Sequence, residues 1–365
     1  MHTNVLLLGP GPCNPSQSVL DSLSAPTLGH MDGEFLDIVE EIKTSLRSLF
    51  KTSNSVTFPV SGTGSSGMEL LLVNFLEPGD KFVVGVNGVF GGRMANLARR
   101  LGAEVVEVTQ DWGRALDNQE FIDTVRREKP KLAALVNGET STGVYQPMDG
   151  IGEAVHEAGG LLMIDCVTSL AGMPVEIDAW GVDVAFSGTQ KCLSVPPGLA
   201  PVTISDRAVE VFRQRKTPVP SFYFDLEQLL QYMDGIGGRS YHHTPPINMT
   251  YGLNTSLTEI LEEGLENRWQ RHADAANYLI QEVEAYGFSP FVPEGERLNP
   301  LTTLSLPEGL DEAAARGQIR SEHLIEVGAG LGPMAGKIWR IGLMGKNAAP
   351  SSVDQLVEAL KATLG

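Results

Sequence analysis

The chain has 365 residues, a length that suggests two or three domains, or one large domain with an appendage. With 42% hydrophobic and 20% charged residues, its composition is that of an ordinary folded protein. Its formal net charge of −18 would repel phosphate-rich polymers, so we expect no nucleic-acid partner. The apolar runs are too short to cross a bilayer, so we expect no membrane partner either.

The first part of the chain predicts an α/β domain. Residues 1–20 are rich in Pro, Gly, Asn and Ser and predict an extended N-terminal arm. Between Gly33 and Lys51 apolar residues recur every three or four positions, which predicts an amphipathic helix. Short apolar runs then alternate with helical patterns, and we expect strands at Val56–Val60, Lys81–Val86, Glu104–Val108, Leu132–Asn137, Leu161–Asp165 and Asp183–Ser187. This alternation predicts a mostly parallel sheet with helices on both faces, a doubly wound α/β domain.

The pattern changes after about residue 250. One long helical pattern runs through Tyr286, isolated strands are expected at Leu301–Leu306 and Ile338–Leu343, and a last helix follows from Val353. These elements predict a smaller α+β domain. The expected division is an arm over residues 1–20, a large domain over 21–262 and a small domain over 263–365.

The first candidate site is a Gly-rich turn between a strand and a helix, Ser61-Gly62-Thr63-Gly64-Ser65-Ser66-Gly67. A helix N-terminus with free backbone N–H groups favours a phosphate there. Gly62, Gly64 and Gly67 also match the G-x-G-x-x-G dinucleotide fingerprint, so an NAD(P)-dependent oxidoreductase is an alternative. However, the next expected strand, Lys81–Val86, runs into Asn87, and that fingerprint requires an acidic residue at this strand end. A tight turn without any ligand is the remaining interpretation.

Two further candidates follow apolar strands. Asp165 closes Leu161–Asp165, and Lys191 follows Ser187-Gly188-Thr189-Gln190. Each alone could be a helix cap or a surface charge, but both belong to the sheet edge where open α/β sheets bind ligands. A phosphate turn, a carboxylate and a lysine together are what pyridoxal phosphate requires: the lysine forms a Schiff base, and the carboxylate keeps the ring nitrogen protonated. The sequence therefore predicts a pyridoxal-phosphate enzyme.

The sequence resembles the class V (fold type I) aminotransferases over nearly its whole length, and within them the alanine–glyoxylate and serine–glyoxylate aminotransferases. The matching segments are Leu8-Gly9-Pro10-Gly11-Pro12, Ser61-Gly62-Thr63-Gly64, Gly138-Glu139-Thr140-Ser141-Thr142-Gly143-Val144, Asp165, Ser187-Gly188-Thr189-Gln190-Lys191 and Arg340-Ile341-Gly342. The resemblance implies a sheet of the seven-stranded type in a large domain, a small α+β domain and a homodimer.

The resemblance also implies roles for individual residues. Lys191 would hold the cofactor and move protons, and Asp165 would pair with the pyridinium. Arg340 would grip the substrate carboxylate. The residues implied to bind the cofactor are Thr63, Gly64 and Gln190 at the phosphate, with Tyr241 and Thr244 reaching it from the neighbouring subunit, Phe90 and Val167 at the ring faces, Thr140 at the ring hydroxyl, and Ser65. Gly11 and Thr140 would line the substrate pocket. Phe90 and Ser65 stand where relatives often carry Trp and His, which leaves the sub-branch open.

The implied activity is ping-pong transamination between alanine or serine and glyoxylate or pyruvate. Because Arg340 is the one arginine that we place in the pocket, we expect small monocarboxylic substrates. Another class V pyridoxal-phosphate enzyme is an alternative, although no cysteine follows Cys192, as a cysteine desulfurase would need. A non-catalytic scaffold is disfavoured because the lysine and the aspartate are both present. The cysteines Cys13, Cys166 and Cys192 lack zinc spacing, so we expect no metal, and together with an N-terminus unlike a signal peptide they suggest a cytoplasmic protein.

Overall fold

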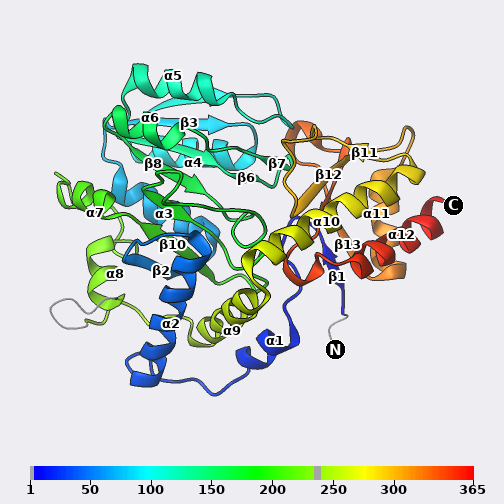
Figure 1. Cartoon of the computed structure of the whole chain (residues 1–365), viewed down its shortest axis with the longest axis horizontal. Helices are drawn as coiled ribbons and strands as arrows, with labels where there is room; N and C mark the ends of the chain where they lie inside the picture. Colours follow the sequence, from blue (N-terminus) through cyan, green and yellow to red (C-terminus); the bar gives the residue numbers. More distant parts are fainter. Residues whose placement is uncertain (1–3, 234–239) are drawn as a thin grey trace.

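Seven strands form the central sheet of the computed structural model, which describes residues 4–233 and 240–365 (Figure 1). The strands are β2 (Val56–Ser61), β3 (Lys81–Val86), β4 (Glu104–Thr109), β5 (Leu132–Val136), β8 (Leu161–Asp165), β9 (Val184–Phe186) and β10 (Leu199–Ile204). Their order is β2-β10-β9-β8-β5-β3-β4. From β9 to β4 every pair is parallel, whereas β10 runs antiparallel to both β9 and β2. The expected mostly parallel α/β sheet is confirmed.

One strand of this sheet is missing from the sequence analysis. Strand β10 follows Pro196-Pro197-Gly198 and contains Pro201, and proline argues against a strand inside a sheet because it donates no N–H. In the structure Pro201 lies opposite Pro59 of β2. Because of these prolines, the sequence pattern did not predict β10, which lies between β2 and β9 in the sheet.

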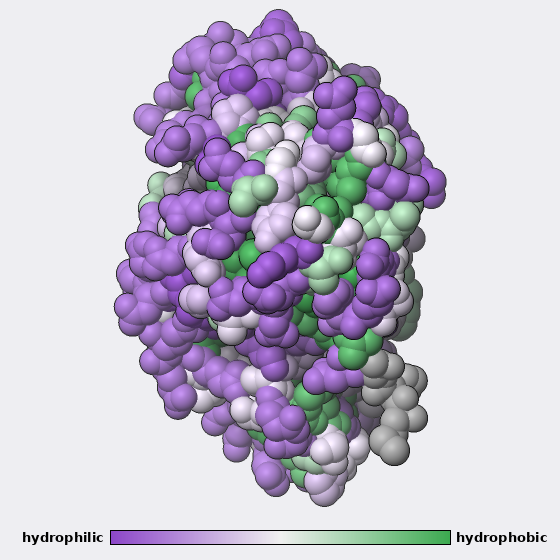
Figure 2. Space-filling view, turned by 90° about the vertical axis from the view of Figure 1, so that its right-hand side faces the viewer, coloured by the Kyte–Doolittle hydropathy of each residue, from purple (hydrophilic) through white to green (hydrophobic). Residues whose placement is uncertain are grey.

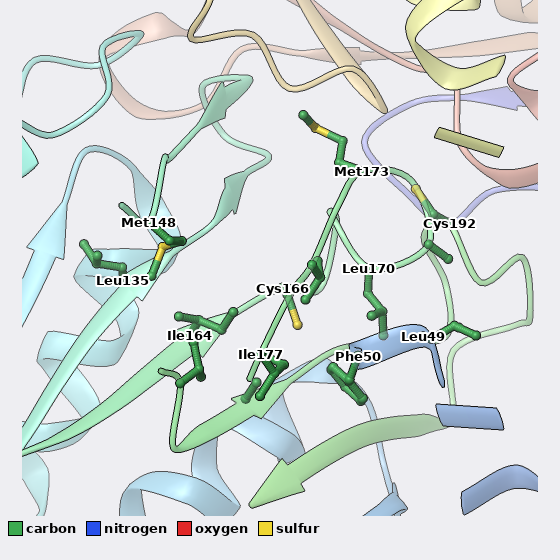
Figure 3. Close-up of a cluster of buried hydrophobic side chains, with 14 of the residues drawn as sticks. Leu49, Phe50, Leu135, Met148, Ile164, Cys166, Leu170, Met173, Ile177 and Cys192 are labelled. Atoms are coloured by element: carbon green, nitrogen blue, oxygen red, sulfur yellow. The ribbon is translucent and has the colours of Figure 1, made fainter. Parts of the chain in front are cut away.

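Helices cover both faces of the central sheet. One face is covered by α3 (Gly64–Phe75), α4 (Val89–Arg100), α7 (Asp206–Arg213) and α8 (Leu226–Met233), and the other by α5 (Asn118–Glu128) and α6 (Ile151–Glu157). Helices α2 (Gly33–Phe50) and α9 (Ile247–Glu263) contribute to both cores. Along β8, Leu162 and Ile164 enter one core and Leu161 and Met163 the other. Figure 3 shows the first of these cores, where Ile164 lies among Leu135, Cys166 and Ile177.

A second sheet carries the C-terminal part of the chain. It contains β11 (Ser289–Pro290), β12 (Leu301–Ser305), β13 (Ile325–Ala329) and β14 (Ile338–Gly342), and it packs against α10 (Leu265–Val283), α11 (Glu312–His323) and α12 (Pro350–Leu364). Strand β13 was not expected from the sequence. Figure 2 views this end of the molecule and shows mostly hydrophilic residues on its surface.

The N-terminal segment is not simply extended. Its first three residues lie outside the described part of the chain, and Leu6–Leu8 form β1, which pairs in parallel with β13 at the edge of the second sheet. Figure 1 shows this segment among the C-terminal elements. Helix α1 (Gln17–Leu23) then packs against α9. The segment therefore joins both parts of the molecule.

The long helical pattern after residue 250 is two helices rather than one. Helix α9 ends and α10 begins at Gly264, whose φ is +83°, a backbone conformation that favours glycine. The division at residues 20 and 262 stays a prediction. No helix within residues 4–233 and 240–365 is long and apolar enough to cross a membrane.

Candidate active site

A pocket of about 190 Å³ opens where β8 and β9 end. It is lined by Gly64, Ser65, Met68, Phe90, Arg93, Gly138, Thr140, Asp165, Val167, Thr168, Phe186, Gln190 and Lys191. Most of the candidates from the sequence thus meet in one place. They come from the Gly-rich turn, the start of α4, the end of β8 and the loop after β9.

Lys191 lies in this pocket, and its side chain is almost buried. Lys191 is 8% exposed, and its Nζ donates a hydrogen bond to the backbone carbonyl oxygen of Pro10. Burial lowers the pKa of Lys191 to about 8, and the nearby Arg340 acts in the same direction. A substantial fraction of the amine is therefore neutral near physiological pH, as a nucleophilic lysine requires.

Gly11 lies directly against Lys191. A Cβ atom on Gly11 would overlap the Nζ, Cδ and Cε atoms of Lys191, and the φ of Gly11 is +104°. The position therefore requires glycine for space and for backbone conformation. Gly11 is not among the residues that line the pocket itself.

Asp165 ends β8, and the residue is 2% exposed. The backbone N–H of Val167 donates to Asp165 Oδ1 at 2.9 Å. Burial raises the pKa of Asp165 to about 7, and the charge of Glu139 adds to this, whereas Lys191 and Arg93 act against it. A carboxylate placed in this way is suited to bind a cationic N–H group inside the pocket.

The N-terminus of α3 forms one wall of the pocket. Its N-cap, Thr63, makes no capping hydrogen bond, and no described backbone carbonyl accepts from the N–H groups of Gly64 and Ser65. The Oε1 atom of Gln190 is buried without a hydrogen-bond partner, and a half turn of that amide would present its NH₂ group instead. The free N–H groups, the helix dipole and this amide fit a bound phosphate.

Arg93 was missed by the sequence analysis. It lies one turn after Phe90 on α4, lines the pocket, and places its guanidinium carbon 4.8 Å from the centroid of the Phe90 ring. Arg340 is therefore not the only arginine near the pocket, which corrects our sequence-based expectation. The sequence signal that could have identified Arg93 is its position three residues after Phe90, because residues three apart lie on the same face of a helix.

Arg340 lies beside the pocket rather than in its wall. The residue is 7% exposed, its Nε donates to Ala329 O at 2.7 Å, and its Nη1 donates to Thr140 O at 3.1 Å. Burial lowers the pKa of Arg340, and the charge of Glu139 opposes this. No described hydrogen bond engages Nη2. The guanidinium is thus fixed in orientation next to Thr140, which does line the pocket.

Three of the candidate cofactor residues do not line the pocket in this chain. Thr63, Tyr241 and Thr244 are exposed and do not line it. The hydroxyls of Tyr241 and Thr244 are 3.3 Å apart. Their segment is tied to the Gly-rich turn because His243 Nε2 and Ser61 Oγ are 2.7 Å apart.

Metal-binding side chains do not cluster in the described residues. In residues 4–233 and 240–365, no group of three or more His, Cys, Asp or Glu side chains is placed to hold a metal ion. The chemistry of the pocket described above comes from one amine, one carboxylate, guanidinium groups and backbone N–H groups.

Comparison with known proteins agrees with this geometry. Residues 17–333 match the model of the family "Aminotransferase class-V". The chain is 41% identical over 363 residues to the alanine–glyoxylate aminotransferase of Felis catus, covering 99% of this chain and 88% of that protein. It is 35% identical over 376 residues to the (S)-ureidoglycine–glyoxylate transaminase of Bacillus subtilis (strain 168), covering 98% and 90%. The crystal structure of alanine–glyoxylate aminotransferase from Nostoc sp. superposes with a TM-score of 0.98 at 44% identity, covering 100% and 96%.

Proposed function

Since the chain belongs to the class V aminotransferases, we propose that it uses pyridoxal 5′-phosphate to transfer an amino group from alanine or serine to glyoxylate or pyruvate. The chain is an aminotransferase of fold type I, and its substrates are amino acids and oxo acids. The proposal adds the cofactor and the individual substrates. The observation that carries it is the meeting of Lys191, Asp165 and the N-terminus of α3 in one pocket.

Each of these groups fits one part of the cofactor. The N–H groups of Gly64 and Ser65, with the Gln190 amide, would hold the phosphate. Asp165 would hold a proton on the ring nitrogen, and Lys191 would bind the aldehyde carbon covalently. When bound, pyridoxal phosphate supplies a ring that withdraws electrons from the substrate carbon. Phe90 and Val167 line the pocket where they would contact the ring.

Lys191 and Arg340 would act on the substrate. A neutral Lys191 amine can accept the proton from the substrate α-carbon and return it to another position. Arg340, held by Thr140 O and Ala329 O, would orient the substrate carboxylate through its remaining N–H group. Because the transfer occurs in two halves at one pocket, the enzyme should follow ping-pong kinetics.

The dinucleotide alternative built on Gly62, Gly64 and Gly67 is set aside because the family covers most of the chain. Visible absorbance tests the proposal directly: the protein mixed with pyridoxal phosphate should turn yellow, and alanine or serine should then change the spectrum of the bound cofactor. Glyoxylate should restore it. A protein that binds no pyridoxal phosphate would overturn the proposal.

We further propose a homodimer in which Tyr241 and Thr244 reach the phosphate site of the neighbouring subunit. Tyr241 is 63% exposed and Phe222 is 69% exposed, and large exposed aromatic side chains are typical of interfaces. Dimer formation and cofactor binding should then be linked. Sedimentation of a fully active monomer would contradict this proposal.

The cytoplasm is our proposal for the location. All three cysteines are buried and free, as thiols remain in a reducing compartment. Finding the native protein in an oxidising compartment by cell fractionation would contradict it.

A further inference from the structure

Helix α4 begins without a cap of its own. Its N-cap is Gly88, which has no side chain to accept a hydrogen bond, although the first N–H groups of any helix need partners. Val89 N donates to Ser141 Oγ at 2.9 Å, and Phe90 N donates to Glu139 Oε2 at 2.9 Å. The cap is therefore supplied by a segment about 50 residues further along the chain.

Glu139 and Ser141 also hold each other. Ser141 N and Ser141 Oγ donate to Glu139 Oε1 at 3.0 and 2.6 Å. Gly91 N is a further donor to Glu139. A Cβ atom at Gly88 would overlap Glu139 and Ser141, so the two segments meet in close contact. Both Glu139 and Ser141 are fully buried.

In every hydrogen bond described for it, the Glu139 carboxyl group is the acceptor. Burial raises the pKa of Glu139, while the hydrogen bonds from Ser141, Phe90 and Gly91 act in the opposite direction. The partial positive charge of a helix N-terminus also favours an anionic acceptor at this place. Glu139 belongs to the segment Gly138–Val144, which matches the family, but the sequence alone assigns it no role.

We propose that Glu139 is a positioning residue: together with Ser141 it caps α4 and thereby holds Phe90 and Arg93 in place at the pocket. This inference rests on the proposed function, because the ligand whose ring Phe90 would contact is pyridoxal phosphate. Glu139 does not line the pocket. We expect its effect on cofactor affinity to pass through the side chains that α4 holds at the pocket, chiefly Phe90.

A matched control separates this role from the general cost of altering a buried carboxylate. Asp183 is 2% exposed and accepts from Leu162 N at 2.8 Å and from Arg207. It precedes β9 and so lies at the edge of the sheet opposite the pocket. Asp183→Asn should lower the melting temperature and leave the dissociation constant of pyridoxal phosphate within about twofold.

The experiment is a double-mutant cycle on cofactor affinity, measured by absorbance titration of the apoprotein with pyridoxal phosphate. Glu139→Gln should weaken binding about tenfold in the wild-type background, because it replaces one of two carboxyl oxygens that accept from backbone N–H groups by an NH₂ group that cannot accept. In a Phe90→Ala background the same substitution should have less than about a twofold effect. Equal factors in both backgrounds, or no change in the wild-type background, would overturn the proposal.

A substitute variant and a wild-type control complete the experiment. If Glu139→Gln does not fold, Ser141→Ala takes its place in the cycle, because it removes the acceptor for Val89 N and one donor to Glu139. It should weaken binding about threefold, again only when Phe90 is present. Absence of pyridoxal phosphate binding by the wild-type protein would instead refute the proposed function, so the two failures are distinguishable.

Discussion

The Nζ atom of Lys191 donates a hydrogen bond to the backbone carbonyl oxygen of Pro10. The segment that carries Pro10 follows β1 at the edge of the second sheet, while Lys191 follows a strand of the central sheet. Cys13 N donates to Gln190 O at 3.1 Å and strengthens the same junction. The N-terminal segment thus closes over the lysine and links the pocket to the second sheet.

This contact predicts a strong effect of Gly11→Ala. The added Cβ would overlap the Lys191 side chain at a position whose φ is +104°, so either the lysine or the segment must move. We expect catalytic efficiency to fall by at least about tenfold. Gly9→Ala is the control, because its Cβ would meet only Gly328 N at 3.8 Å. Steady-state kinetics of both variants provides the test, and equal activity of the two would contradict the expectation.

Replacement of the lysine itself should abolish transamination. Lys191→Ala removes the only amine that lines the described pocket, so we expect turnover to fall by at least about a hundredfold while the protein still folds. Borohydride treatment with pyridoxal phosphate, followed by mass spectrometry, should label the wild type at Lys191 and leave the variant unlabelled. Persistent turnover with a label elsewhere would show that another amine is used.

The pKa of Lys191 gives a pH prediction for the apoprotein. Burial lowers this pKa to about 8, and only the neutral amine attacks an aldehyde. The rate at which the apoprotein captures pyridoxal phosphate should therefore rise with pH and level off above about 8. A stopped-flow absorbance series from pH 6 to 10 measures it. A rate that continues to rise to the ordinary lysine pKa of about 10.4 would contradict the lowered pKa.

For Asp165→Asn we expect severe loss of activity with modest loss of stability. A neutral amide cannot hold the proton on the ring nitrogen, and loss of this charge should cost on the order of a hundredfold in turnover. The amide oxygen of the variant can still accept the hydrogen bond from Val167 N, which Asp165 Oδ1 accepts at 2.9 Å in the wild type. Exchange of the substrate α-proton, followed by NMR, provides the measurement. A near-normal exchange rate would count against the assigned role.

The site residues that could be predicted from the sequence are those marked by their immediate neighbours in the chain. Asp165 and Lys191 stand out because polar residues directly follow short apolar runs, and the fold places such strand ends at one edge. Arg93 has no such signal, and although Glu139 follows the expected strand Leu132–Asn137, nothing local shows which groups it binds. Arg93 is one of several charges on an amphipathic helix, and Glu139 acquires its partners from a segment about 50 residues away.

The same distinction holds for the fold. Most of the parallel strands were predicted because their apolar runs are buried on both faces, whereas the edge strand β4 is partly exposed. Strand β1 has three residues, which is too short for a pattern, and it forms only because β13 offers an edge. The break at Gly264 was missed because a single glycine does not interrupt the apolar periodicity on either side.

Two arginines near the pocket sharpen the prediction about substrates. Arg340 is buried and held in orientation by Ala329 O and Thr140 O, which suits one carboxylate. Arg93 is exposed and stacks over Phe90. An exposed cation contributes little to binding because water and salt screen it, about 0 to 1 kcal/mol, whereas a buried charge-assisted hydrogen bond is worth about 1.5 to 3 kcal/mol.

We therefore expect alanine and serine to react at least about tenfold more efficiently than aspartate and glutamate, since about 1.4 kcal/mol corresponds to tenfold. Arg340→Lys keeps the charge but loses the planar fork, so efficiency should fall for every donor alike. Arg93→Gln should lower only the residual reaction of the dicarboxylates, by less than about fivefold. Half-reaction rates for the four donors on the wild type and both variants measure these effects. A contrary outcome would be equal rates for alanine and aspartate on the wild type, with the aspartate reaction lost in Arg93→Gln. That outcome would show that Arg93 binds a second carboxylate strongly despite its exposure.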